Sequence, residues 1–301
     1  MRDQHKQLLE SLRSGSFRSL ARAITMVENE LDGATEILYS LNNVGEAKVV
    51  GITGPPGAGK STLVNELIRQ WKKEFTKIAV IAVDPSSPFN FGSLLGDRIR
   101  MHEHYNDPQI YIRSLATRGS LGGLNGHIIE ITDVVKEAGF DRIIVETVGV
   151  GQSEVEVAGL ADCTVVVLVP EAGDEVQTLK SGIMEIADLF VVNKSDRDGA
   201  ELFLRNLHLM VHDRTSGHEI PVIKTMASTG EGIAELASAI SATLVQMTNS
   251  PEKKVQLLTE KCLQLIQQRK MKSVNVRQLS SDLDKLINKQ SFNIYEFSAR
   301  Y

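Results

Sequence analysis

The residues best suited to chemistry form a glycine-rich loop, G-P-P-G-A-G-K-S, at positions 54–61. The loop follows the apolar run 48–53 and opens an amphipathic stretch. Glycines allow successive backbone N–H groups to point at one anion, and a helix N-terminus adds partial positive charge there. Lys60 would reach the outer phosphates of a nucleotide, and the Ser61 hydroxyl would bind Mg²⁺. The predicted phosphate site comprises Gly54, Pro55, Pro56, Gly57, Ala58, Gly59, Lys60, Ser61 and Thr62.

A second polar sequence, N-K-S-D at 193–196, indicates the base of that nucleotide. The Asp196 carboxylate can accept hydrogen bonds from N1–H and the 2-amino group of guanine, whereas adenine has neither donor there. The aliphatic part of Lys194 can cover the ring, and Asn193 can tie this segment to the phosphate loop. Two candidates for reading the guanine oxygen lie in a later M-A-S-T-G turn, Ala227 and Ser228. The predicted ligands are therefore GTP and GDP.

Carboxylates after other apolar runs are candidates for holding the metal ion. Glu146 begins E-T-V-G, in which glutamate replaces the aspartate of the common D-x-x-G pattern. The Gly149 N–H could meet the γ-phosphate, and Gln152 is the candidate for orienting the attacking water. Mg²⁺ takes hard oxygen ligands, directly or through water. The predicted metal set is Ser61, Asp84, Asp97 and Glu146, and the predicted catalytic set is Lys60, Asp97, Glu146 and Gln152.

Seven short apolar runs alternate with amphipathic stretches and would position these residues. Strands that are nearly all apolar are typical of a sheet covered by helices on both faces. The pattern predicts an α/β fold with a doubly wound, mostly parallel sheet. The expected strands are 48–53, 77–83, 109–114, 142–147, 164–169, 189–193 and 221–225. The expected parts are an N-terminal helical extension (1–45), a P-loop GTPase domain (46–250) and a C-terminal helical dimerisation arm (251–301).

The N-terminal part has apolar residues three and four apart and no β-branched run, which predicts a helical hairpin packed on the main domain. Its arginines and serines also suit an organelle transit peptide, but Asp3 and Glu10 do not.

The C-terminal part begins after the turn-forming N-S-P at 249–251 and contains two apolar stripes at helical spacing. Between residues 252 and 289 there are nine Lys or Arg against four Asp or Glu. These helices either pack on their own domain with a solvated basic face, or form an arm that packs on a second copy. We favour a homodimer, because a projecting helix pair has little core of its own. The stripes are Val255, Leu258, Cys262, Leu265 and Ile266, then Val276, Leu279, Leu283, Leu286 and Ile287.

Composition narrows the class of protein. The chain has 301 residues, of which 42% are apolar and 24% charged, as in ordinary globular proteins. Its net charge of −5 gives no reason to expect nucleic acid or an anionic membrane as a partner. Cys163 and Cys262 are far apart and form no metal or disulfide pattern. These features, with no recognised targeting signal, lead us to expect a cytoplasmic protein.

Several longer segments together are more specific than any one motif. They are V-D-P-S-S-P, L-L-G-D-R-I-R-M, S-L-A-T-R-G-S-L-G-G-L, E-T-V-G-V-G-Q-S-E and G-D-E-V-Q-T-L-K-S-G-I-M-E-I-A-D. In combination they resemble the MeaB/ArgK-type GTPases, which include the methylmalonic aciduria type A protein. The resemblance implies a homodimeric GTPase that chaperones an adenosylcobalamin-dependent acyl-CoA mutase of the methylmalonyl-CoA mutase type. Such a chaperone gates cofactor loading and protects the mutase, and the mutase stimulates its GTP hydrolysis.

The resemblance also implies a switch between residues 173 and 188 that relays the nucleotide state to the mutase. Its matching residues are Asp174, Glu175, Gln177 and Lys180. Phe91 and Glu171 depart from the family pattern, where glycine is expected at both positions.

Two further points stay open at this stage. Four arginines lie in segments that could approach the phosphates, although each reads more simply as a surface or salt-bridging residue: Arg98, Arg100, Arg113 and Arg118. The alternative functions are a metal-insertion GTPase for a nickel or cobalt enzyme, a nucleotide-dependent kinase of a transport protein, and a nucleotide-bound scaffold without useful hydrolysis.

Overall fold

The computed structural model of the protein describes ten stretches of the chain. They are residues 2–42, 47–84, 101–116, 124–147, 156–173, 183–214, 220–248, 251–271, 273–286 and 293–298. Internal contacts divide the chain into two compact units, Met1–Pro251 and Glu252–Tyr301. No helix among the described residues is both long and apolar enough to cross a membrane.

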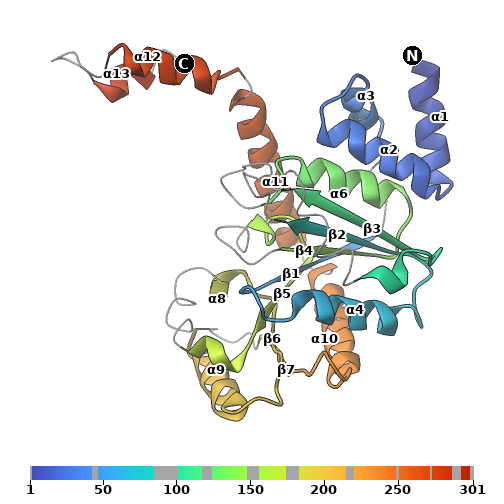
Figure 1. Ribbon diagram of the computed structural model, residues 1–301, viewed down its shortest axis with the longest axis vertical. Coiled ribbons are helices and arrows are strands. Elements are labelled where there is room, and N and C mark those ends of the chain that lie inside the picture. The colour runs from blue at the N-terminus through green and yellow to red at the C-terminus, as the bar shows by residue number, and fades with distance from the viewer. Residues whose placement is uncertain are drawn as a thin grey trace. The chain divides into compact units, whose positions relative to one another are not determined.

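The larger unit is built on a sheet of seven parallel strands in the order β3-β2-β4-β1-β5-β6-β7 (Figure 1). Every predicted strand is present, with ends that differ from the prediction by at most two residues. All residues of β5 and β6 are buried, because helices cover both faces. The strands are β1 (Lys48–Thr53), β2 (Ile78–Asp84), β3 (Ile110–Ala116), β4 (Arg142–Glu146), β5 (Cys163–Leu168), β6 (Leu189–Val192) and β7 (Val222–Lys224).

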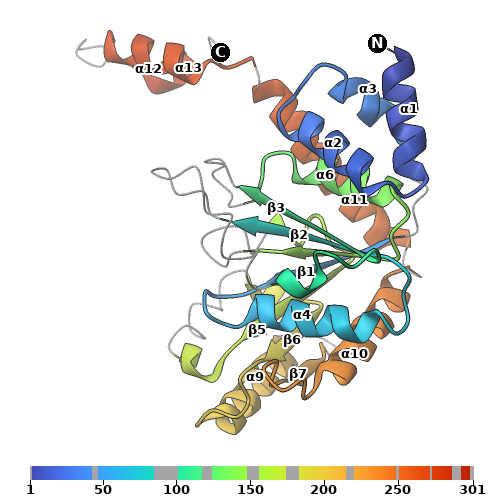
Figure 2. The same ribbon diagram turned by 45° about the vertical axis from the view of Figure 1, so that its right-hand side comes forward.

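Two sets of helices enclose the sheet (Figures 1 and 2). One face is covered by α4 (Lys60–Trp71) and α10 (Ile233–Thr248), whose apolar side chains share a core with Ile52 of β1. The opposite face is covered by α6 (Ile128–Glu137), α8 (Ile183–Ile186) and α9 (Ala200–Arg214). There Phe203 and Leu207 of α9 pack against Phe190 of β6. The predicted doubly wound α/β fold is therefore confirmed.

The N-terminal helices form an additional layer outside α6, against which α2 packs (Figure 2). The predicted hairpin corresponds to α1 (Arg2–Arg13) and α2 (Phe17–Glu28). A third helix, α3 (Ala34–Tyr39), follows the hairpin within the part expected to be helical, and it contacts both of the others.

An ion pair joins this layer to the sheet. Arg113 of β3 donates to Glu28 Oε2 at 2.9 Å and to Thr25 Oγ1 at 3.3 Å, and the Glu28 side chain is 7% exposed. Arg113 is therefore a salt-bridging residue at the junction with α2, which was the simpler of its two interpretations.

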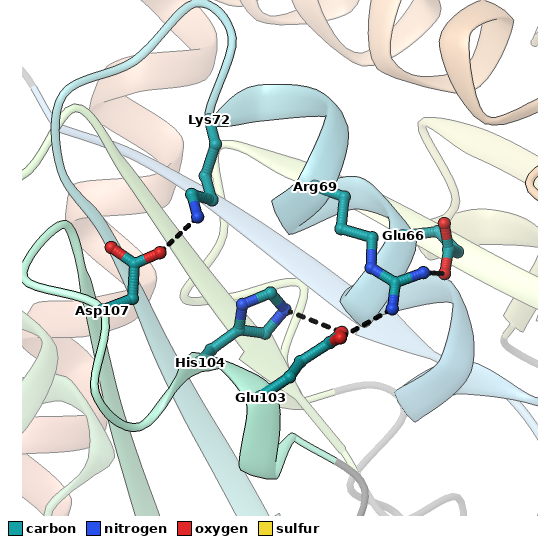
Figure 3. Close-up of polar contacts among 6 residues, drawn as sticks. All are labelled: Glu66, Arg69, Lys72, Glu103, His104 and Asp107. Carbon is teal, nitrogen blue, oxygen red and sulfur yellow. Dashed lines mark hydrogen bonds and ion pairs between the residues drawn. The ribbon is translucent and has the colours of Figure 1, made fainter.

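A polar cluster lies between α4 and the segment around the short helix η1 (His102–His104) (Figure 3). Its members are Glu66 and Arg69 of α4 and Lys72 directly after it, together with Glu103, His104 and Asp107. Arg69 donates to Glu66 Oε1 and to Glu103 Oε2, at 2.6 Å in each case. Lys72 pairs with Asp107. The cluster thus holds residues 103–107 against the helix whose first turn belongs to the phosphate loop.

His104 is the buried member of this cluster, with 4% of its surface exposed and its Nε2 3.4 Å from Glu103 Oε1. Burial lowers the pKa of His104 below its ordinary value of 6.5. The charges of Lys72 and Arg69 act in the same direction, whereas those of Glu103 and Asp107 oppose it. The imidazole is therefore neutral at pH 7.

We expect the free energy of unfolding to fall as the pH drops through the region just below 6.5. Between the folded pKa and that value the unfolded state binds more protons, so stability rises with pH there by at most about 1.4 kcal/mol per unit. Urea unfolding at several pH values in this range gives the free energy of unfolding as a function of pH. That free energy should rise less steeply with pH for His104→Gln than for the wild-type protein. His208→Gln, at an exposed position of α9, is the control. Equal slopes for the wild type and His104→Gln would contradict the prediction.

The smaller unit contains three helices among its described residues, α11 (Pro251–Met271), α12 (Val276–Asp284) and α13 (Ile294–Ser298). The Asn275 side chain caps α12 by accepting from Arg277 N and Gln278 N at 3.1 Å each. No residue of α12 is buried, although its sequence is strongly amphipathic. The first predicted stripe lies on α11, and Ile287 of the second lies outside the described residues.

Candidate nucleotide-binding site

The glycine-rich loop connects β1 to α4 and demands glycine at two positions. Gly54 has a φ of +136°, and a Cβ there would lie 2.0 Å from the carbonyl oxygen of Val167 on β5. Gly59, with a φ of +87°, caps α4, and a Cβ there would lie 2.5 Å from Asn193 Nδ2. Both positions exclude a side chain, so the loop runs close against its neighbours.

Lys60 is the first residue of α4 and is buried within the loop. Its Nζ donates to the carbonyl oxygens of Gly54 and Pro55, at 2.8 and 2.9 Å. A buried ammonium needs such partners. The contacts keep a positive charge inside the loop, beside the N-terminus of α4, which itself favours anions.

A hydroxyl and a carboxylate meet beside the loop. Ser61 Oγ donates to Glu146 Oε1 at 2.6 Å, and the two residues are 7% and 5% exposed. Ser61 lies in the first turn of α4, whereas Glu146 ends β4, between β1 and β2 in the sheet. Hard oxygen ligands from two elements, side by side in a nearly buried position, fit Mg²⁺. Asp84 ends the adjacent strand β2, where its backbone lies beside that of Ala116.

Asn193 joins three segments of the site. Its Nδ2 donates to the Ala58 carbonyl oxygen at 2.8 Å. Its Oδ1 accepts from Thr225 Oγ1 and from Ala227 N, each at 3.1 Å. The contact expected between Asn193 and the phosphate loop is therefore present. Sequence reasoning missed the buried Thr225, although a threonine ending an apolar run was a visible signal.

Lys194 follows in the left-handed region with a φ of +57°, a conformation that costs a non-glycine residue roughly 1–2 kcal/mol. Its Nζ donates to the Gly57 carbonyl oxygen at 2.6 Å. Its aliphatic part therefore spans from the N-K-S-D segment at 193–196, here called the base loop, to the phosphate loop. Asp196 and Ser228 are both exposed, as groups that bind a ligand from solvent must be. Ala227 is buried, and its backbone N–H donates to Asn193 Oδ1.

Parallel strands bring the remaining segments to the same edge of the sheet. The chain leaves β2, β3 and β4 at the edge where the phosphate loop follows β1. The short helix η2 (Pro170–Gly173) follows β5, and its Glu171 pairs with Arg197, just after Asp196. Many of the predicted residues follow these strand ends and lie outside the described residues, namely Phe91, Asp97, Arg98, Arg100, Arg118, Gly149, Gln152, Asp174, Glu175, Gln177 and Lys180.

Fold and site together define the class of protein. A parallel sheet with a glycine-rich Lys-Ser loop after its central strand β1 and an N-K-x-D sequence after β6 is the arrangement of a P-loop GTPase. Within that class, the family model described as "Methylmalonyl Co-A mutase-associated GTPase MeaB" matches residues 20–279. The chain therefore belongs to the MeaB family, and it is a GTPase that binds guanine nucleotides and hydrolyses GTP.

Relatives of known name agree with this assignment. A protein of Pyrococcus abyssi whose name describes a GTPase is 50% identical over 236 residues, which cover 76% of this chain and 73% of that protein. The mouse "Methylmalonic aciduria type A homolog, mitochondrial" is 38% identical over 269 residues, covering 82% of this chain and 64% of that protein.

Solved structures extend the comparison. The crystal structure of an LAO/AO transport system kinase aligns with a TM-score of 0.74 and 26% identity, covering 99% of this chain and 98% of that one. HypB from Helicobacter pylori, solved in complex with nickel, aligns with a TM-score of 0.52 and 16% identity over 72% of this chain and 96% of that one. The second similarity is one of fold alone.

Proposed function

We propose that this protein is a Mg²⁺-dependent GTPase that chaperones an adenosylcobalamin-dependent acyl-CoA mutase of the methylmalonyl-CoA mutase type. It gates loading of the cofactor and protects the mutase from inactivation. The main support is membership of a family whose description names association with methylmalonyl-CoA mutase. The mouse relative, named for methylmalonic aciduria, supports the same partner.

The chain's own residues account for binding and for part of the catalysis. The N–H groups of residues 54–62 hold the phosphates, and Lys60 turns from the loop carbonyls to the phosphate oxygens. Ser61 and Glu146 hold the metal ion. The observation that carries this role is the adjacency of Ser61 Oγ and Glu146 Oε1. Mg²⁺, when bound, neutralises charge that develops on the phosphates. Asp196 accepts the two guanine N–H groups while Lys194 covers the ring.

Residues outside the described part of the chain complete this proposal. Among them, Asp97 assists at the metal together with Asp84 at the end of β2, the Gly149 N–H meets the γ-phosphate, and Gln152 orients water. The switch formed by Asp174, Glu175, Gln177 and Lys180 relays the nucleotide state to the mutase. The Glu171–Arg197 pair supports such a relay, because it ties η2, which leads into this segment, to the residue directly after Asp196.

The same proposal includes a homodimer formed through residues 251–301. Six large apolar side chains of α11 and α12 are 47% to 68% exposed: Val255, Leu258, Leu263, Ile266, Met271 and Val276. Large exposed apolar surfaces mark sites of association. A second copy of the chain would cover them.

GTP turnover measured alone and with such a mutase from the same organism tests the proposal. We expect the mutase to raise the rate by at least about 10-fold, because phosphoryl transfer depends on groups that a partner can order or supply. An acyl-CoA enzyme without cobalamin serves as the control. Sedimentation of each mixture reports association, and the protein alone should sediment at twice the mass of one chain. Absence of both association and stimulation with every such mutase would reject the chaperone role.

A kinase acting on a transport protein is the second candidate, favoured by the name of the LAO/AO structure. The same assay separates the two. A GTPase releases the γ-phosphate of labelled GTP as free phosphate, whereas a kinase leaves it on a protein.

A further inference from the structure

Three of the largely apolar strand sequences end in threonine, at Thr53, Thr147 and Thr225. The first two of these threonines face each other. Thr53, the last residue of β1, and Thr147, directly after β4, place their Oγ1 atoms 2.8 Å apart. The two residues are 0% and 1% exposed. Buried hydroxyls are costly unless hydrogen-bonded, and here the two share a hydrogen bond in which one donates and the other accepts.

The hydroxyl pair adds a link beyond the end of the sheet ladder. The last residues paired between β1 and β4 are Ile52 and Glu146. Thr147 N then donates to the Ile52 carbonyl oxygen at 3.0 Å. The side-chain bond from Thr53 to Thr147 therefore joins the residue just before Gly54 to the residue just after Glu146.

The end of β4 is held on both faces of the sheet. Successive side chains of a strand point to opposite faces. Ile52 packs with Leu63 of α4, and Glu146 bonds Ser61 of α4, so these two side chains point toward α4. Thr53 and its partner Thr147 consequently lie on the other face. On the face toward α4 the strand end is held by the Ser61–Glu146 hydrogen bond, and on the other face it is held by the hydroxyl pair.

We propose that Thr53 and Thr147 are positioning residues for the metal site, acting through Glu146. The proposal rests on the proposed role of Ser61 and Glu146 in binding Mg²⁺. With the pair intact, the strand end cannot rotate about its backbone bond to Ile52, and the carboxylate stays beside Ser61. Because Mg²⁺ demands near-ideal octahedral geometry, rotation of this carboxylate weakens metal binding.

Threonine-to-valine changes separate positioning from stability. Valine keeps the shape but lacks the hydroxyl, so each single change leaves the partner hydroxyl buried without an acceptor or donor. Changing both removes that penalty, and such double replacements are often nearly neutral for stability. The double variant still lacks the link between the strands. Thr147→Ser keeps the hydroxyl and is the conservative control.

The test uses the full chain and three readouts: the urea midpoint, the Mg²⁺ concentration that half-maximally tightens GDP binding, and hydrogen exchange of the Thr147 amide without Mg²⁺ or nucleotide. We expect this Mg²⁺ concentration to be at least about 10-fold higher than in the wild type for Thr53→Val, Thr147→Val and the double variant. The double variant should regain most of the urea midpoint yet exchange the Thr147 amide faster than wild type. Thr147→Ser should behave as wild type does.

Each outcome decides between the two roles. Recovery of the wild-type Mg²⁺ requirement in the double variant, along with its stability, would mean that the pair only supports the fold. Ser61→Ala tests the assignment of the metal site independently of the threonine pair. If Ser61→Ala changes the Mg²⁺ requirement and the valine variants do not, the inference alone is overturned. An unchanged requirement in Ser61→Ala rejects the metal site and the inference with it.

Discussion

Replacing Lys60 with alanine is expected to lower the rate of GTP hydrolysis by about 10²–10³-fold, the usual effect of removing one preorganised donor from developing charge. The Lys60 ammonium lies within the phosphate loop, where it meets the carbonyl oxygens of Gly54 and Pro55. Alanine is well tolerated at a helix start, so circular dichroism should report an unchanged helix content. Single-turnover release of phosphate from GTP measures the effect.

The matched control is Lys73→Ala, just beyond the far end of the same helix. Lys73 is exposed and donates to Gln70 Oε1. Its removal should leave the rate within a factor of about two, since exposed contacts of this kind contribute little. A Lys60→Ala protein that hydrolyses GTP as fast as Lys73→Ala would disprove the assignment of the phosphate site.

Asp196→Asn should exchange the base preference from guanine to xanthine. The asparagine amide offers a donor where guanine also has one, so GTP affinity should fall by about 100-fold or more, equivalent to about 3 kcal/mol. Xanthine carries a carbonyl oxygen in place of the 2-amino group, and the new amide can donate to it. Competition of GTP and xanthosine triphosphate for a fluorescent nucleotide measures both affinities.

Asp198→Asn provides the comparison, because Asp198 is exposed and lies two residues further along the same loop. That variant should retain wild-type affinity for GTP. If Asp196→Asn also binds GTP as the wild type does, the guanine-binding assignment is wrong.

The fold could be predicted because its strands are unusually clear. Runs such as T-V-V-V-L-V leave little choice for a buried segment bounded by turns, and β5 is buried throughout. The short helix α3 lies in the part expected to be helical, but it was not delimited as a separate helix because its six residues are too few to show a helical period. Its position depends on contacts with α1 and α2, which no local pattern encodes.

The candidate site divides in the same way between local and distant contacts. The phosphate loop and N-K-S-D were recognisable because each is a continuous sequence whose chemistry is local. The Thr53–Thr147 bond joins residues 94 positions apart and depends on which strands become neighbours. The sequence motifs do not include His104, whereas the fold buries it beside the ion pairs that Arg69 and Lys72 make with Glu103 and Asp107.

The bonds of Asn193 have a consequence for how tightly a whole nucleotide is held compared with its pieces. One side chain fixes the base loop, the turn at Ala227 and the phosphate loop to one another. Once the phosphates are bound, the base therefore meets its own subsite at a high effective concentration, with little further loss of freedom. This chelate effect favours guanosine di- and triphosphates over guanosine or pyrophosphate alone, without any additional contact.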